Sequence, residues 1–102
     1  MGFFELFGKR ADLAAGLATA HSTPGAVVLD VRTTEEYAGG HVPGSVNLPL
    51  GEIQGISLPQ TTPLFVYCHS GARSSQAVAY LNAHGYTAVN LGGIAGYRGA
   101  VE

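Results

Sequence analysis

The sequence predicts an α/β fold in which a mostly parallel central sheet is covered by helices on both faces. Short apolar runs alternate along the chain with segments of helical periodicity, which is typical of parallel strands joined by helices. Two runs, residues 26–31 and 64–67, are apolar over nearly their whole length, as expected of strands buried on both sides. The chain has 102 residues, enough for one hydrophobic core, so we expect residues 1–102 to form a single domain.

The expected elements follow from apolar periodicity and from residues that begin and end helices. Leu13 and Leu17 stand four positions apart among alanines, which is helical spacing. Thr33 and Glu36 have the spacing of a capping box, and Gly39 lies where that helix would stop. In chain order we expect a helix at 9–20, a strand at 26–31, a helix at 33–37, a short strand at 45–49, a strand at 64–67, a helix at 74–84 and a strand at 88–91.

Proline and glycine mark the ends of the later elements. Pro49 closes the short strand, and Gly85 ends the last helix. Gly92 and Gly93 follow the last strand. Residues 51–62 are mostly polar and predict no regular element.

The composition excludes several classes of partner and site. The net charge is −2 and the five Lys and Arg residues are scattered, so we expect no nucleic-acid partner. No apolar run approaches the ~20 residues that span a bilayer. In residues 1–10 the apolar side chains precede most of the charged ones, which is the reverse of a signal peptide. We therefore expect no membrane partner and a cytoplasmic location. A single cysteine and four dispersed histidines suggest neither an internal disulfide nor a zinc site, and we expect no metal and no cofactor.

The seven residues that follow the strand at 64–67 carry the most chemical information. They contain the only cysteine, a glycine and an arginine, and they lead into the last helix. Backbone N–H groups at the start of a helix favour an anion, and with nearby cations they lower the pKa of a cysteine. We interpret the segment as a cradle for a reactive thiolate and for the anionic group that reacts with it. Its residues are Cys68, His69, Ser70, Gly71, Ala72, Arg73 and Ser74.

A lone cysteine is also compatible with a purely structural role, because free cysteines are often buried and pack like small apolar side chains. The surroundings of Cys68 favour reactivity. Asp30 and Arg32 lie at the end of one buried strand, as Cys68 and His69 lie at the end of the other. Ligands of parallel α/β sheets bind beyond the carboxyl ends of the strands, so we expect both sets of residues at one edge.

Four motifs in this chain together resemble the single-domain rhodanese-like sulfurtransferases. They occur in a suitable order and spacing from residue 26 onward, and their combination is specific although each motif alone is weak. The motifs are Leu29-Asp30-Val31-Arg32 with Glu36-Tyr37, residues 40–49, residues 67–75, and Gly85-Tyr86 with Leu91-Gly92-Gly93-Ile94. The resemblance implies a single rhodanese-like domain, whose active-site loop joins the C-terminus of a strand to the N-terminus of a helix.

The same resemblance implies a sulfurtransferase that carries sulfur as a persulfide on Cys68. The donor would be thiosulfate or a similar small anion, and the acceptor a thiol, cyanide or the thiol of a partner protein. The N–H groups of residues 69–74 would bind the terminal sulfur, and Arg73 would hold the oxygens of the donor. We interpret Asp30 and Arg32 as supporting residues that order the neighbouring loops.

The chain departs from the family pattern in three places. His69 stands where arginine is frequent, and Tyr97 stands where the closing segment usually has tryptophan. The strand that the family has before its first helix is poorly formed, unless residues 3–6 supply it. These differences concern substrate preference and the edge of the sheet more than the chemistry.

Two other classes of protein share part of this pattern. Cysteine phosphatases and arsenate reductases also combine a thiolate with an arginine, but with one residue more than the four between Cys68 and Arg73. A shorter loop accommodates a sulfur atom more readily than a phosphate, and no aspartate follows closely as a general acid. A non-catalytic interaction module is the other alternative, and the presence of Cys68, Gly71 and Arg73 argues against it. A thiosulfate assay beside a phosphate-ester assay separates these classes.

Overall fold

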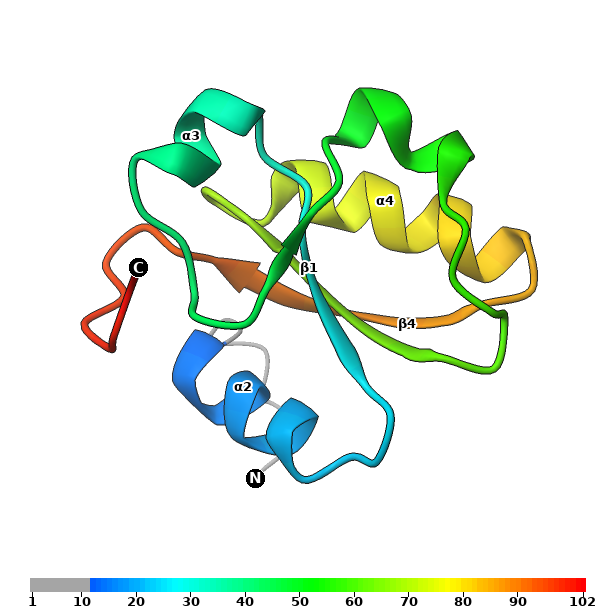
Figure 1. The fold of residues 1–102 in the computed structure, drawn as a ribbon, viewed down its shortest axis with the longest axis horizontal. Coiled ribbons are helices and arrows are strands. Elements are labelled where there is room, and N and C mark those ends of the chain that lie inside the picture. Colours follow the sequence, from blue (N-terminus) through cyan, green and yellow to red (C-terminus); the bar gives the residue numbers. More distant parts are fainter. Residues whose placement is uncertain (1–11) are drawn as a thin grey trace, which may run out of the picture.

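The computed structural model describes residues 12–102, which contain a four-stranded sheet (Figure 1). The strands are β1 (Val27–Asp30), β2 (Val46–Asn47), β3 (Pro63–Cys68) and β4 (Thr87–Gly93). The helices are α2 (Leu13–His21), α3 (Thr34–Ala38), the 3₁₀ helix η1 (Leu50–Gly55) and α4 (Ala72–Ala83). All neighbouring strands are parallel, in the order β2-β1-β3-β4, so their carboxyl ends meet at one edge of the sheet.

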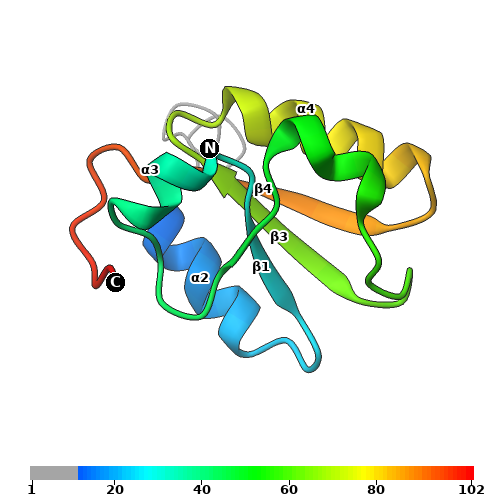
Figure 2. The ribbon, with the colours of Figure 1, turned by 45° about the horizontal axis from the view of Figure 1, so that its top comes forward.

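Helices cover both faces of the sheet. Helix α2 packs on one face, and α4 and η1 lie on the other, as the two ribbon views show (Figures 1 and 2). The hydrophobic core accordingly has two layers, one on each side of the sheet. This arrangement confirms the α/β class, the parallel sheet and the two helical layers that the sequence predicts.

The central strand β3 contributes to both layers of the core. Leu64, Val66 and Cys68 belong to the layer beneath α4, and each is 0% exposed. Phe65 and Tyr67 belong to the layer beneath α2 and are also buried. Successive side chains of a strand point to opposite faces, so a continuous apolar run fills both layers at once.

The N-terminal half follows the predicted order of elements. Helix α2 and strand β1 correspond to the expected helix at 9–20 and strand at 26–31, and β2 lies within the short strand expected at 45–49. The capping box at the start of α3 is confirmed: Thr33 Oγ1 accepts from the N–H of Glu36 at 3.1 Å, and Glu36 Oε1 accepts from the N–H of Thr33 at 2.9 Å. The candidate first strand at residues 3–6 lies outside the described residues.

Several elements differ from expectation, and three of these differences concern the site or the core. Helix α4 begins two residues earlier than predicted, because the chain turns sharply at Gly71, where φ is 101°. Strand β4 extends to Gly93, which still pairs with Cys68. Most of η1 lies within residues 51–62, for which the sequence predicted no element, and its Ile53 is only 5% exposed. One buried side chain is too weak a periodic signal to predict such a short helix.

Candidate active site

Cys68 is the last residue of the central strand, and its sulfur lies inside the loop that leads into α4. The N–H of Gly71 donates to this sulfur at 3.0 Å, and the N–H of Ser74 donates at 3.4 Å. The hydroxyl oxygen of Ser74 is also 3.4 Å from the sulfur. Cys68 and Ser74 are both 0% exposed. The loop therefore surrounds a buried sulfur with hydrogen-bond donors.

Two opposing effects act on the pKa of the Cys68 thiol. Burial raises this pKa, because it disfavours the charged thiolate. Hydrogen bonds from the hydroxyl and N–H of Ser74, and from the N–H groups of Gly71 and Ser70, lower it. The hydrogen bonds together outweigh burial, so the pKa of the thiol lies below its ordinary value. The fraction present as nucleophilic thiolate at neutral pH is increased accordingly.

A glycine on β4 lets the loop lie directly against the edge strand. A Cβ atom at position 93, where the chain has Gly93, would overlap the backbone carbonyl of His69. This close approach allows two backbone hydrogen bonds to form just beyond β4. The N–H of Ile94 donates to the carbonyl of Cys68 at 2.9 Å, and the N–H of Ala95 donates to that of His69 at 3.0 Å. Strand β4 and the residues after it thus support one side of the loop.

The exposed part of the loop borders a cavity of about 490 Å³. His69, Ser70 and Ala72 are exposed, and the first two line this cavity. The cavity lies between the loop and the end of β4, and none of its lining residues is Lys, Arg, Asp or Glu. The lining residues are His69, Ser70, Gly71, Asn90, Gly92, Gly93 and Ala95.

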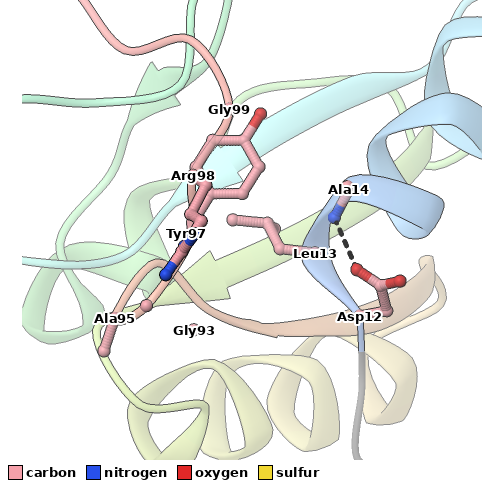
Figure 3. Close-up of a pocket in the computed structure, with 9 residues that line it drawn as sticks. Asp12, Leu13, Ala14, Gly93, Ala95, Tyr97, Arg98 and Gly99 are labelled. Atoms are coloured by element: carbon pink, nitrogen blue, oxygen red, sulfur yellow. Dashed lines mark hydrogen bonds between the residues drawn. The ribbon is translucent and has the colours of Figure 1, made fainter.

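A second cavity, of about 340 Å³, shares Gly93 and Ala95 with the first (Figure 3). It lies between the start of α2 and the segment that follows β4. The ring of Tyr97 lines one side, and Asp12 lies on the other. The carboxylate of Asp12 is engaged as the N-cap of α2, because it accepts from the N–H of Ala14 at 3.1 Å. Open space therefore flanks the segment after β4 on both sides.

Arg73 and Glu36 connect α4 to α3 beside the loop. Two guanidinium nitrogens of Arg73 donate to the two carboxylate oxygens of Glu36, at 2.7 and 3.0 Å. Both side chains are 34% exposed. The hydrogen bonds from Arg73, followed by that from the N–H of Thr33, lower the pKa of Glu36 to about 2. One carboxylate therefore serves both the capping box of α3 and the ion pair to α4.

Asp30 and Arg32 form a buried ion pair at the end of β1. Nη2 of Arg32 is 2.6 Å from Oδ2 of Asp30, and Nε is 3.0 Å from both carboxylate oxygens. The hydrogen bond to Asp30 raises the pKa of Arg32. Arg32 also donates to the carbonyl of Gly40 at 2.8 Å, and the amide of Asn47 donates to the backbone carbonyls of both members of the pair. The ion pair thus joins β1 to the segments that follow α3 and form β2.

Asn90 is a site residue that the sequence reasoning missed. Its Oδ1 accepts from the hydroxyl of Ser74 at 2.7 Å and from the N–H of Gly92 at 2.9 Å. Its Nδ2 donates to the carbonyl of Gly71 at 3.3 Å. The available signal was a polar residue in an otherwise apolar strand, placed shortly before two glycines. Asn90 connects β4 to the loop and to the hydroxyl that contacts the sulfur.

In residues 12–102, no group of three His, Cys, Asp or Glu side chains is close enough together to hold a metal ion. Two of the histidines instead contact tyrosines of their own segments. His41 stacks on Tyr37, and His84 stacks on Tyr80. Across the same residues, no helix combines the length and apolar character needed to cross a membrane.

A model of the rhodanese-like domain family matches residues 12–100, and the chain belongs to this family. Thiosulfate sulfurtransferase PspE of Escherichia coli is 39% identical over 71 residues, which cover 65% of this chain and 68% of that protein. The putative sulfur carrier protein YrkF of Bacillus subtilis is 39% identical over 64 residues, which cover 61% of this chain. The match spans only 35% of YrkF.

The fold also resembles that of solved rhodanese-like structures. A rhodanese-like domain protein from Staphylococcus aureus superimposes with a TM-score of 0.74 and 32% sequence identity. The superposition covers 84% of this chain and 89% of that one.

Replacement of Gly93 by alanine is expected to displace the loop from β4, because the added Cβ overlaps the carbonyl of His69. We expect Gly93→Ala to lower the free energy of unfolding by about 1–3 kcal/mol, as overpacking does. Cys68 should also alkylate more slowly at neutral pH, because the donors move away from its sulfur. The control is Gly55→Ala, at a glycine with open space around its Cβ position. Equal effects of the two substitutions would contradict this account.

The ion pair of Glu36 is expected to stabilise the fold only when its carboxylate is charged. The folded pKa of Glu36 is lowered from 4.5 to about 2, so its contribution is complete above pH 4.5 and is lost as the pH falls to 2. Glu36→Gln keeps an acceptor for the capping box and removes the charge. Because the pair is partly exposed, we expect the free energy of unfolding at neutral pH to fall by less than about 1 kcal/mol.

The measurement is chemical denaturation at a series of pH values. The difference between wild type and Glu36→Gln should shrink from pH 4.5 to pH 2, where the wild-type carboxylate becomes protonated. Glu35→Gln is the matched control, since Glu35 lies in the same helical turn and its carboxylate accepts a hydrogen bond from the hydroxyl of its neighbour Thr34. A difference that does not depend on pH in this range would rule out the charged pair as the cause.

Proposed function

We propose that this protein is a sulfurtransferase that moves a sulfane sulfur from thiosulfate, or a similar small anionic donor, to a thiol or cyanide acceptor through a persulfide on Cys68. The observation that carries this proposal is the convergence of loop donors on the buried sulfur of Cys68. Membership of the rhodanese-like family supports it. The similarity to PspE, which is named a thiosulfate sulfurtransferase, supports thiosulfate as a donor.

The reaction would proceed in two displacements at sulfur. The thiolate of Cys68 attacks the outer sulfur of thiosulfate, the S–S bond of thiosulfate breaks, and sulfite leaves with its electron pair. Cys68 then carries a persulfide with one negative charge on the terminal sulfur. An acceptor thiolate or cyanide attacks this terminal sulfur, and the electron pair of the broken S–S bond returns to Cys68 as a thiolate. The products are sulfite and either an acceptor persulfide or thiocyanate, and no external oxidant or reductant is required.

The loop would stabilise negative charge in both displacements. The N–H groups of Gly71 and Ser74 already point at the sulfur, and they lie at the start of α4, where the helix dipole favours an anion. Donors held in place by the fold need not reorganise when charge develops, which makes them effective in catalysis. The N–H groups of His69, Ser70 and Ala72 would complete the cradle around the terminal sulfur.

Arg73 is proposed to bind the oxygens of an anionic donor. Two of its N–H donors are engaged by Glu36, which fixes the guanidinium beside the loop. An arginine has five N–H donors in a planar arrangement, so groups remain for a second oxyanion. Fixed in this way, the guanidinium would neutralise part of the charge that a thiosulfate dianion brings to the thiolate.

Persulfide formation on Cys68 can be observed directly by intact mass spectrometry. Incubation with excess thiosulfate should add the mass of one sulfur atom, and a thiol reductant should remove it. The chain contains one cysteine, so the Cys68→Ala variant should show no such gain. A gain of equal size in Cys68→Ala, or no gain in wild type, would exclude the proposed mechanism, and the absence of a gain would favour a non-catalytic interaction module.

The role of Arg73 can be separated from that of its ion pair. Arg73→Ala should reduce kcat/KM with thiosulfate by a factor equivalent to about 1.5–3 kcal/mol, the range for hydrogen bonds to charged groups. A neutral sulfur donor should be affected much less. Glu36→Gln, which removes the same ion pair and keeps the arginine, should reduce thiosulfate turnover only slightly.

Equal losses in Arg73→Ala and Glu36→Gln with both donors would contradict this role. That result would mean that Arg73 holds α3 and α4 together and does not bind the donor.

A further inference from the structure

The hydroxyl proton of Ser74 has three acceptors within reach. Its oxygen is 2.7 Å from Oδ1 of Asn90, but 3.4 Å from both the sulfur of Cys68 and the carbonyl oxygen of Gly92. A serine hydroxyl donates a single hydrogen bond. The shortest contact is the one to Asn90, so Asn90 is a strong competitor of the sulfur for this proton.

The orientation of the Asn90 amide follows from the backbone groups that it contacts. The N–H of Gly92 requires an acceptor, which places Oδ1 there at 2.9 Å. The carbonyl of Gly71 requires a donor, which places Nδ2 there at 3.3 Å. A flipped amide would lose both contacts. Ser74 therefore faces an oxygen, to which its hydroxyl can only donate.

The pairing of β4 with β3 is irregular directly after Asn90. Val66 of β3 pairs with Asn90, whereas the next residue, Tyr67, pairs with Gly92, so β4 contains one additional residue. Irregularities of this kind are often found beside functional sites, where they change the direction of a side chain. Gly92 has a φ of 95°, which suits a glycine at such a turn. The fold thereby presents the Asn90 amide to the loop.

We propose that Asn90 is a positioning residue for sulfur transfer, whose Oδ1 competes with the sulfur of Cys68 for the hydroxyl proton of Ser74. The inference rests on the proposed function, because it concerns the charged sulfur of that reaction. In the neutral state the thiol donates to the oxygen of Ser74, and Ser74 donates to Asn90. In the thiolate or persulfide state, Ser74 can turn its proton to the sulfur only if its hydrogen bond to Asn90 breaks. Asn90 thus limits how strongly the loop stabilises the charged sulfur.

The charged and titratable groups near the sulfur lie outside β4, the strand that carries Asn90. The charge of Arg73 on α4 interacts with that of Cys68, and Arg73 is paired with Glu36 of α3. Asp30 lies at the end of β1, and His69 is the next residue of the loop. In the described structure none of these side chains is hydrogen-bonded to Asn90. A substitution of Asn90 by a neutral residue therefore leaves their charges in place.

The test is the pH dependence of the alkylation rate of Cys68 in wild type, Asn90→Ala, Ser74→Ala and the double variant. Asn90→Ala should lower the pKa of the thiol by about half a unit to one unit, because the hydroxyl of Ser74 becomes free to donate to the thiolate. Ser74→Ala should raise the pKa. In the Ser74→Ala background, Asn90→Ala should no longer lower it.

Asn90→Asp provides a second variant with the opposite expectation. Its carboxylate keeps a strong acceptor for the hydroxyl of Ser74 and adds a negative charge, so the pKa of Cys68 should rise. Asn82→Ala is the matched control. Asn82 also connects α4 to β4 through two hydrogen bonds to the backbone of Ala88, at 2.8 and 3.2 Å, but at the other end of the helix. Asn82→Ala should lower the melting temperature and leave the pKa of Cys68 unchanged.

If the pKa of Cys68 is unchanged or raised in folded Asn90→Ala, the proposed competition for the Ser74 proton is wrong. It is also wrong if Asn90→Ala lowers this pKa equally in the wild-type and Ser74→Ala backgrounds. If Asn90→Ala does not fold, a lowered or unchanged pKa in Asn90→Asp overturns it. Alkylation does not require sulfur transfer, so this result is independent of persulfide formation. A wild-type protein that alkylates as expected but gains no sulfur from donors overturns the proposed function instead.

Discussion

The sulfur of Cys68 is fully buried at the end of the central strand, and burial opposes the negative charge that a nucleophilic thiolate must carry. Hydrogen bonds from the loop offset this effect. Contacts between the loop and β4 keep these hydrogen-bond donors in place. Gly93 allows the loop to approach β4, and the N–H of Ala95 holds the carbonyl of His69. Without these donors Cys68 would be an ordinary buried cysteine with a raised pKa. The balance between burial and hydrogen bonding is therefore the interaction on which the site depends.

The parallel sheet explains why this balance arises at one edge of the molecule. Strands β1 and β3 are neighbours and end together, with Asp30 opposite Tyr67, so the Asp30–Arg32 ion pair lies beside the loop of Cys68. The alternation of side chains along β3 turns Cys68 toward the face that α4 covers. The helix that packs on this face is also the helix whose N-terminus supplies donors to the sulfur. Helix α4 therefore contributes both to the packing of the core and to the stabilisation of charge on the sulfur.

Much of the fold could be predicted from the sequence, because local patterns determine it. The apolar run of β3, the spacing of Leu13 and Leu17, and the capping box at Thr33 each reflect contacts close in the chain or the burial of one element. The loop from Cys68 to Ser74 could be identified as a candidate site for the same reason. The partners of that loop could not, because Glu36 lies 37 positions from Arg73, and Asn90 lies 16 positions from Ser74. Such contacts depend on how helices and strands pack, and no periodicity in the sequence indicates them.

The most direct measurement for this account compares the thiolate absorbance of the folded protein with that of the same protein in denaturant, as a function of pH. Subtraction of the Cys68→Ala spectrum removes the absorbance of the tyrosines and leaves the signal of the one cysteine. Because the hydrogen bonds of the loop outweigh burial, we expect the thiol of the folded protein to ionise at a lower pH than the thiol of the unfolded chain. A folded protein whose thiol ionises at the same pH as the unfolded chain, or at a higher pH, would contradict it, because burial would then outweigh the hydrogen bonds of the loop.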